Sequence, residues 1–343
     1  MKRNILTSLL LSLVIIMTAC GSQDVGANPT LIVENTKPIA TKPLGLVTPK
    51  ETAENTELVE TQPLAMTTTT KAVENTEPVA TQPLIGTPTL APNPREITFQ
   101  AADGQDLKGL YYPAAVNPAP LVVLMHWVNG DKSDWYEVAP WLQNRGFDNP
   151  YPNPGNQSWW DPTWFPTVPQ DISYGVFIFS FRDCLPADRG GCPKIDEDGW
   201  LLDAQAAAAK AVLLEGVDPT RIAFIGSSIG ADGAIDGCAW LVQNRPGACQ
   251  GALSLSPGGY LTIPYEQAVQ TLGGNLPPVA AWCLADEIEI GICTTAEKVE
   301  NNAFKSFEIP TGKHGNMLMR PELDPLPMEL ILDFLAQTIG SDK

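Results

Sequence analysis

Histidine and basic side chains are scarce in this sequence. Its 343 residues include two histidines, and 21 Lys and Arg stand against 39 Asp and Glu, which gives a formal charge of −18. Because so few basic residues could not neutralise a phosphate backbone, the charge excludes nucleic acid as a partner. It also disfavours electrostatic binding to anionic membranes. The sequence has no CxxC pair and no histidine cluster, so neither a metal nor another cofactor is expected.

A hydrophobic run long enough to span a bilayer is also missing at the N-terminus. The apolar run over residues 5–19 has 15 positions, short of the about 20 that a transmembrane helix needs. With Lys2 and Arg3 before it, the run predicts an export signal over residues 1–19. Its end, Met17–Cys20, resembles the bacterial lipobox. That resemblance implies cleavage before Cys20 and acylation of this cysteine, which would anchor the protein to a bacterial membrane outside the cytoplasm. Ordinary secretion and a signal anchor are the alternatives.

Residues 20–94 lack the bulky apolar side chains from which a core is built. Three related units begin at Val33, Ala53 and Val73, spaced by 20 residues and rich in Pro, Thr and Glu. A repeat of this length can build a solenoid, but these units cannot bury a core. They predict a disordered linker that carries the folded domain.

From Arg95 onwards the pattern changes to that of a folded domain, which we expect to span residues 95–343. Two alternating segments around Asp103 and Gly104 predict a β-hairpin. Short apolar runs that suit strands buried on both faces then alternate with helical sequence. The expected strands are 120–127, 175–181, 222–225, 251–256, 277–283 and 305–310, and the expected helices are 135–145, 199–215 and 325–339, with one more helix between 256 and 277. This alternation predicts the α/β class, a mostly parallel central sheet with helices on both faces.

Ser228 lies at the centre of the stretch around which this domain is organised, Gly226-Ser227-Ser228-Ile229-Gly230. An apolar strand precedes it and Ala- and Ile-rich sequence follows, so a strand, a tight turn and a helix are expected. Glycines two residues either side of the serine let strand and helix approach closely, so that the turn can hold Ser228 in a strained, exposed position. Backbone N–H groups at the helix N-terminus would then favour negative charge beside the hydroxyl.

The Gly-x-Ser-x-Gly turn and the alternating strands and helices together resemble the α/β-hydrolase superfamily, and within it the dienelactone-hydrolase-like serine esterases. The resemblance covers the whole of the expected folded domain. It implies the chain order nucleophile, acid, histidine, which selects His314, in a loop between the last strand and the last helix, as the base. Asp286 matches the family's acid, which follows a strand by a few residues, and Glu287 and Glu289 are neighbours that could substitute. Asp183 precedes the nucleophile in the chain and is taken as structural.

The tetrahedral intermediate of such an enzyme needs preorganised hydrogen-bond donors. The resemblance implies the backbone N–H of Ile229 as one donor and that of Trp127 as the other. Trp127 stands where the family has glycine, so a Cβ must be tolerated there and the indole ring is expected to line the substrate pocket. His126, at the end of the preceding strand, is expected to order this loop rather than to catalyse.

Six cysteines follow Cys20 and form three locally spaced pairs. An exported protein favours disulfides, and we expect sequential pairing among the 15 connectivities that six cysteines allow. The expected bridges are Cys184–Cys192, Cys238–Cys249 and Cys283–Cys293, the last of which would close the loop that carries Asp286.

An insertion over about residues 147–171 separates a helix from a strand that the family joins quickly. It is rich in proline and carries several aromatic residues, among them Trp159, Trp160 and Trp164. Loops of this length tend to be functional, so these tryptophans are candidate pocket residues that could stack on a sugar or an aryl group. Burial of the rings against the body of the domain is the alternative.

These features predict a serine hydrolase that acts on small-molecule or polymer-linked carboxylic esters through an acyl-enzyme, with Ser228, His314 and Asp286 as its triad. A serine peptidase similar to the prolyl oligopeptidases is the alternative enzyme. A surface protein that binds glycans without catalysis is the alternative from another class.

Overall fold

A central sheet organises the part of the chain that this computed structural model describes, residues 90–152 and 161–340. The chain divides into two units, Met1–Val79 and Ala80–Lys343, and all described residues belong to the second. The predicted signal peptide, the linker repeats, Cys20, Trp159 and Trp160 lie outside the described residues.

The sheet has eight strands in the order β1-β2-β4-β3-β5-β6-β7-β8. β2 pairs antiparallel with β1 and β4, and all other neighbours are parallel. The strands are β1 (Arg95–Gln100), β2 (Asp106–Tyr112), β3 (Ala119–Met125), β4 (Gly175–Phe179), β5 (Val217–Ser227), β6 (Cys249–Leu255), β7 (Ala280–Ala285) and β8 (Phe304–Glu308). The predicted hairpin and the mostly parallel sheet are therefore confirmed.

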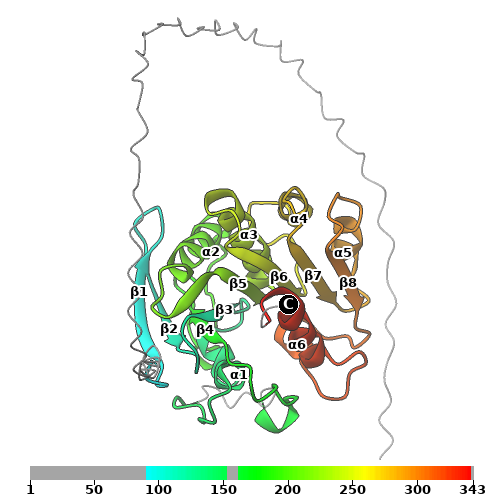
Figure 1. Cartoon of the computed structure of the whole chain (residues 1–343). Coiled ribbons are helices and arrows are strands. Elements are labelled where there is room, and N and C mark those ends of the chain that lie inside the picture. The colour runs from blue at the N-terminus through cyan, green and yellow to red at the C-terminus, as the bar shows by residue number, and fades with distance from the viewer. Residues whose placement is uncertain (1–89, 153–160, 341–343) are drawn as a thin grey trace, which may run out of the picture. The chain divides into compact units, whose positions relative to one another are not determined.

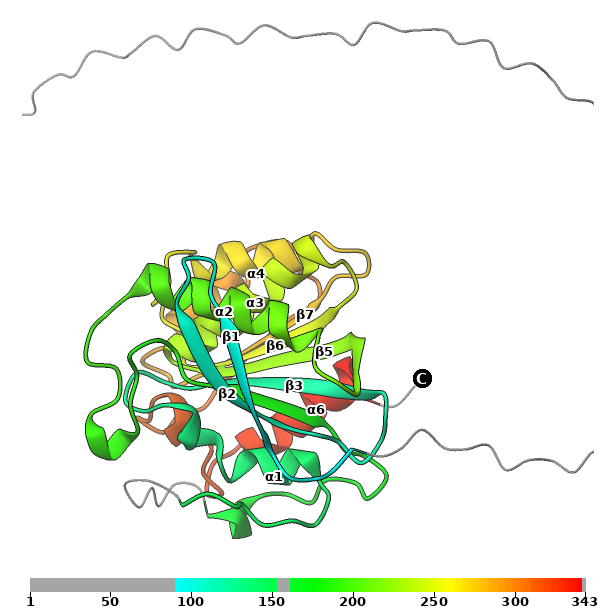
Figure 2. The ribbon, with the colours of Figure 1, turned by 90° about the vertical axis from the view of Figure 1, so that its left-hand side faces the viewer.

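Helices cover both faces of the sheet, as Figure 1 and Figure 2 show. On one face lie α2 (Glu197–Ala211), α3 (Ile229–Asn244), α4 (Tyr265–Gly273) and α5 (Gly291–Ala296), and on the other lie α1 (Val138–Gln143) and α6 (Pro327–Thr338). The short 3-10 helices are η1 (Lys132–Trp135), η3 (Pro162–Trp164), η4 (Ala187–Arg189) and η5 (Gly315–Leu318). With this strand order and these two helical layers, the domain has the α/β-hydrolase fold. None of the helices in the described ranges has the length and apolar character that crossing a membrane requires.

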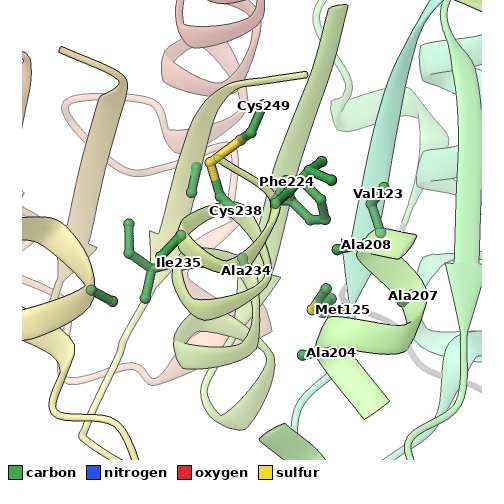
Figure 3. Packing of buried hydrophobic residues seen from close by; sticks show 14 of the residues in the cluster. Val123, Met125, Ala204, Ala207, Ala208, Phe224, Ala234, Ile235, Cys238 and Cys249 are labelled. Carbon is green, nitrogen blue, oxygen red and sulfur yellow. A yellow bond between two sulfur atoms is a disulfide. The ribbon is translucent and has the colours of Figure 1, made fainter. Parts of the chain in front are cut away.

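The core consists of two layers because alternate residues of each buried strand point to opposite faces. In β3, Val123 and Met125 belong to the layer under α2 and α3, whereas Val122 and Leu124 belong to the layer under α1 and α6. Figure 3 shows the first of these layers, where small alanines of α2 meet Met125 and Phe224 of the strands. Burial on both faces is the reason why these strands are continuous apolar runs in the sequence.

All three predicted disulfides are present in the structure, which confirms sequential pairing. Cys238–Cys249 ties α3 to β6 (Figure 3). Cys184–Cys192 closes the loop after β4. Cys283–Cys293 joins β7 to α5 and thereby closes the loop that carries Asp286.

Candidate active site

The turn between β5 and α3 holds Ser228 in an unusual backbone conformation, with φ 55° and ψ −119°. A Cβ on Gly226 would collide with the carbonyl oxygen of Gly230, and a Cβ on Gly230 would collide with the carbonyl oxygen of Met125. Glycine is therefore required at both positions for β5, α3 and the end of β3 to approach this closely. A positive φ at a non-glycine residue is sterically costly and persists where the surroundings enforce it, as at a nucleophilic serine.

Ser228 is buried (2 % exposed), and its backbone N–H donates to the carbonyl of Leu255 in β6 at 2.9 Å. The next residue, Ile229, begins α3. Its N–H is one of the first four of the helix, which have no carbonyl partner within the helix. A partial positive charge therefore lies beside the Ser228 hydroxyl.

A cavity of about 260 Å³ opens over Ser228. Its walls come from the loop after β3, the N-terminus of α2, the turn at Ser228, the loop after β6 and the loop after β8. The lining residues are Val128, Ile195, Glu197, Trp200, Ser228, Ile229, Gly259, Tyr260 and His314. The structure thus brings the predicted nucleophile and the predicted base into one cavity, although they are 86 positions apart in the chain.

His314 follows β8 and immediately precedes η5. Its Nδ1 atom lies 2.7 Å from Oε1 of Glu289, and each of the two side chains is about one third exposed. A carboxylate oxygen only accepts, so Nδ1 carries a proton, and in the neutral ring Nε2 then keeps its lone pair. This arrangement holds the imidazole in the tautomer that a general base needs.

The prediction of Asp286 as the partner of His314 is wrong in this structure, because Nδ1 of His314 contacts Glu289, whereas the Asp286 oxygens accept from backbone N–H groups. Oδ1 accepts from Ile288 at 3.0 Å, and Oδ2 accepts from Thr311 at 2.8 Å and Gly312 at 2.5 Å. These bonds hold the pKa of Asp286 below its usual range, with the one from Thr311 as the largest cause. Asp286 therefore fastens the loop on which His314 stands, while Glu289 reaches the imidazole.

A second anchor fixes the other end of the same loop. The N–H of Gly315 donates to Oγ of Ser256 at 2.9 Å, and Ser256 directly follows β6. A Cβ on Gly315 would lie 3.8 Å from Cβ of Ser228 and would collide with the Ser227 side chain. The residue after His314 thus packs directly against the turn that carries Ser228.

His126 orders the loop after β3, as its sequence position indicated. Nδ1 lies 2.7 Å from the carbonyl of Trp127, and Nε2 accepts the N–H of Phe181 at 3.0 Å. Both ring nitrogens are therefore used in holding the backbone. Burial lowers the pKa of His126 to about 4, which keeps the ring neutral at ordinary pH.

The indole ring of Trp127 does not line the cavity, contrary to the prediction. The ring is buried, its N–H bonds the carboxyl of Asp134, and it packs beneath Gly315. Val128, the next residue, lines the cavity instead. The roles of the Trp127 and Ile229 backbone N–H groups as oxyanion donors remain predictions.

Trp164 also lies away from the cavity, in η3 of the insertion, where the Arg320 guanidinium sits 5.6 Å from its ring centre. The described part of the insertion packs on α1: the rings of Trp141 and Phe165 are 5.3 Å apart, and Trp141 Nε1 donates to the carbonyl of Pro166 at 2.7 Å. Trp164 is therefore not a pocket residue in this structure. A separate cavity of about 340 Å³ lies between α1 and the insertion.

Two features of the cavity were missed at the sequence level. Tyr260 and Trp200 are aromatic residues of ordinary loop and helix segments, and no spacing distinguishes them from core residues.

Among the described residues no group of three His, Cys, Asp or Glu side chains is placed to hold a metal ion.

Comparison with known proteins adds likenesses of fold. No protein-family model matches the chain, and no curated protein sequence is significantly similar to it. An esterase of Pyrobaculum calidifontis has 15 % identity and a TM-score of 0.49, with 74 % of this chain and 87 % of that chain covered. An esterase of Pyrococcus furiosus has 15 % identity and a TM-score of 0.47, with 72 % of this chain and 94 % of that chain covered. Dipeptidyl peptidase 4 of Porphyromonas gingivalis has 13 % identity and a TM-score of 0.46, with 71 % of this chain and 35 % of that chain covered. At this level of similarity they do not indicate what this chain acts on.

Proposed function

We propose that this protein is a serine hydrolase that cleaves carboxylic esters, with Ser228 as nucleophile, His314 as general base and Glu289 as the acid that orients His314. The observation that carries the proposal is the shared cavity of Ser228 and His314, together with the 2.7 Å contact of His314 Nδ1 with Glu289. A serine hydroxyl is a weak nucleophile that needs an oriented base. The strained turn, the base and its orienting carboxylate are the parts of that machinery.

The reaction proceeds in two displacements. Ser228 Oγ attacks the ester carbonyl carbon while Nε2 of His314 takes the hydroxyl proton. That proton passes to the ester oxygen as its bond to carbon breaks, so an alcohol leaves and an acyl-serine remains. Water then attacks the acyl carbon, gives its proton to His314, and the acid leaves as Ser228 regains a proton. Glu289 stabilises the imidazolium that forms in each step, and the N–H groups of Ile229 and Trp127 are the proposed donors to the oxyanion.

The size and chemistry of the cavity favour a small ester. Its volume of about 260 Å³ lies just below the usual range of small-molecule sites, which begins at about 300 Å³. Val128, Ile195, Trp200 and Tyr260 give it apolar walls, which suit one short acyl chain or one aromatic ring. Among the described residues, no Lys or Arg lines the cavity. The dienelactone-hydrolase-like subtype expected from the sequence stays a prediction.

Covalent labelling with a fluorophosphonate probe tests the proposal. The wild-type protein is expected to react with the probe and to hydrolyse p-nitrophenyl acetate, and Ser228→Ala is expected to lose both. Ser227→Ala is the matched control, because the neighbouring serine is fully buried and its loss should leave labelling intact. A wild type without labelling, or a labelled Ser228→Ala variant, would overturn the proposal. Cleavage of peptide p-nitroanilides at a rate similar to that of esters would instead identify a peptidase.

We further propose that the mature protein is tethered outside the cytoplasm through an acylated Cys20. The lipobox-like end of the N-terminal apolar run supports this location. Three disulfides are also typical of an oxidising compartment. Fractionation of cells that express the full chain tests the proposal: the wild type should sediment with membranes and Cys20→Ala should not.

A further inference from the structure

Tyr260 is a polar residue of the cavity to which the proposed reaction assigns no role. It stands in the loop after β6 and lines the cavity with Ser228 and His314. Its hydroxyl is hydrogen-bonded to the side chain of Ser228. Its ring meets the His314 ring edge-on, with 6.3 Å between ring centres. The phenol therefore contacts the nucleophile directly and borders the base.

Asp232 fixes the position of Tyr260 from within α3. This carboxylate is buried (1 % exposed). Its Oδ2 atom accepts the backbone N–H of Tyr260 at 2.5 Å, and the N–H groups of Gly258 and Gly259 also interact with this carboxyl group. Asp232 lies in the first turn of α3, and Ser228 is the residue that caps the N-terminus of the same helix. The nucleophile and the loop that holds Tyr260 are thus set by a single rigid element.

Two glycines of this loop, Gly258 and Gly259, determine the position of the Tyr260 ring. A Cβ on Gly258 would collide with the Tyr260 ring, and Gly259 has a φ of +68°. Any other residue at 258 would push the ring away from its position. The loop is therefore shaped to keep the phenol over Ser228.

The order of the strands places Tyr260 on one side of Ser228. β5 lies between β3 and β6. The loop after β3, with Trp127, is on one side of the nucleophile, and the loops after β6 and β8, with Tyr260 and His314, are on the other. An oxyanion directed at the Trp127 and Ile229 N–H groups leaves the departing ester oxygen on the side of Tyr260 and His314.

On the basis of the proposed function, we propose that Tyr260 is a further catalytic residue that donates a hydrogen bond to the departing ester oxygen, and that Asp232 is its positioning residue. As the bond between the acyl carbon and this oxygen breaks, negative charge grows on the oxygen. The Tyr260 O–H stabilises that charge without giving up its proton. The proton that neutralises the oxygen is the one that His314 took from Ser228, so the proton balance of the reaction is unchanged.

Tyr260→Phe tests this assignment, because it removes the hydroxyl and keeps the ring. Two acetate esters are compared, the p-nitrophenyl ester with an acidic leaving group and the ethyl ester with a weakly acidic one. A hydrogen bond to a charged oxygen corresponds to roughly 10- to 100-fold in rate. We expect a loss of that size in kcat/KM for the ethyl ester, and a loss within about threefold for the p-nitrophenyl ester, whose departure needs little help.

The positioning role of Asp232 has its own readout. Asp232→Ala removes the acceptor of the three N–H groups and is expected to reproduce the substrate-dependent loss of Tyr260→Phe. In the double variant, Asp232→Ala with Tyr260→Phe, kcat/KM for the ethyl ester should fall no further than with Tyr260→Phe alone. Asp232→Asn is the matched variant that keeps one acceptor oxygen, and it should retain most of the ethyl ester activity. Circular dichroism and labelling stoichiometry establish that each variant is folded with a reactive Ser228.

The outcomes separate this inference from the proposed function. Equal losses on both esters would show that Tyr260 only orients Ser228, and the absence of any loss would show no catalytic role; either result overturns the inference. A wild type that neither labels nor hydrolyses either ester overturns the proposed function itself. If wild type and Tyr260→Phe are both fully labelled and show the same ester selectivity, the proposed hydrolase function stands and only the role of Tyr260 is overturned.

Discussion

At the scale of single residues, the distance from the end of β7 to the imidazole decides which carboxylate contacts His314. Asp286 is the first residue after β7 and its short side chain is surrounded by the N–H groups of the neighbouring loop. Glu289 stands three residues further and has one more methylene group, so it reaches Nδ1. Sequence position favoured Asp286, since the competition from backbone donors becomes visible only when β7 and the loop after β8 are placed side by side.

Glu289→Gln should abolish most of the activity. Loss of the carboxylate that holds the base in its reactive tautomer costs about 10⁴ in kcat in serine proteases, and we expect a loss between about 10² and 10⁴ here. Thermal stability should change little because Glu289 is about one third exposed. Steady-state ester hydrolysis and calorimetry measure the two effects.

The neighbouring carboxylates are the controls for that prediction. Glu287 is exposed, so Glu287→Gln should leave kcat unchanged. Asp286→Asn should lower the free energy of unfolding by about 1–3 kcal/mol, because a buried acceptor of three N–H bonds is weakened. An inactive Asp286→Asn of wild-type stability beside an active Glu289→Gln would contradict the assignment.

At the scale of elements, the contact between β5 and α3 depends on the absence of side chains at two glycines. Gly226 and Gly230 permit it, and the glycine spacing in the sequence was enough to predict this turn and Ser228 within it. The six residues of α5 were not predicted, because a helix of this length shows no usable periodicity. The sequence therefore indicated the strands and the turn at Ser228, whereas the loops that carry Glu289 and Tyr260 depend on tertiary contacts.

Gly230→Ala should destabilise the domain strongly. The added methyl group would meet the backbone carbonyls of Met125 and His126, which cannot rotate away as a side chain can. Overpacking of this kind costs typically about 1–3 kcal/mol and sometimes more, and urea unfolding measures it. Gly291→Ala is the control, because nothing lies within 4 Å of its added Cβ. Equal stability of the two variants would refute the close approach.

α3 also carries a buried titrating pair whose pH dependence can be measured. Burial raises the pKa of Asp232 to about 7, against 3.8 when exposed, and it also raises that of Asp236, which faces Asp232. Between about pH 4 and 7 the folded protein keeps a proton that the unfolded chain has released. The contribution of Asp232 to the free energy of unfolding therefore falls as pH rises through this window.

Asp232→Asn isolates this contribution because asparagine does not titrate. The stability of the variant relative to the wild type should rise from pH 4 to about pH 7, by up to a few kcal/mol at about 1.4 kcal/mol per pKa unit, and should then level off. Urea unfolding of both proteins at a series of pH values measures the difference. A difference that does not vary with pH would show that Asp232 is not shifted.

At the scale of the whole molecule, the acidic composition extends into the cavity. Glu197 is the charged residue at the N-terminus of α2 that lines it, and the net charge is −18. Both oppose the approach of an anion. The composition that excluded nucleic acid as a partner therefore also bears on which esters the proposed hydrolase would accept.

Esters with a negatively charged acyl group should be poor substrates. We expect the kcat/KM of a p-nitrophenyl hemisuccinate to be about tenfold or more below that of the neutral butyrate at low salt. The difference should narrow as salt is raised, because the Debye length falls from about 30 Å at 0.01 M to about 10 Å at 0.1 M. Glu197→Gln should reduce the difference between the two esters further. Glu215→Gln serves as the control, because Glu215 is an exposed carboxylate that pairs with Arg95. A ratio insensitive to both salt and Glu197 would count against charge selection.

The bridge between Cys283 and Cys293 spans the short segment that bears both Asp286 and Glu289. While the two sulfurs are still thiols, that segment is free to sample other arrangements, and the alignment of the imidazole is correspondingly less well fixed. Under the proposed function, full catalytic power would then arrive together with oxidation. A newly made chain would be less active toward esters until the bridge between Cys283 and Cys293 forms.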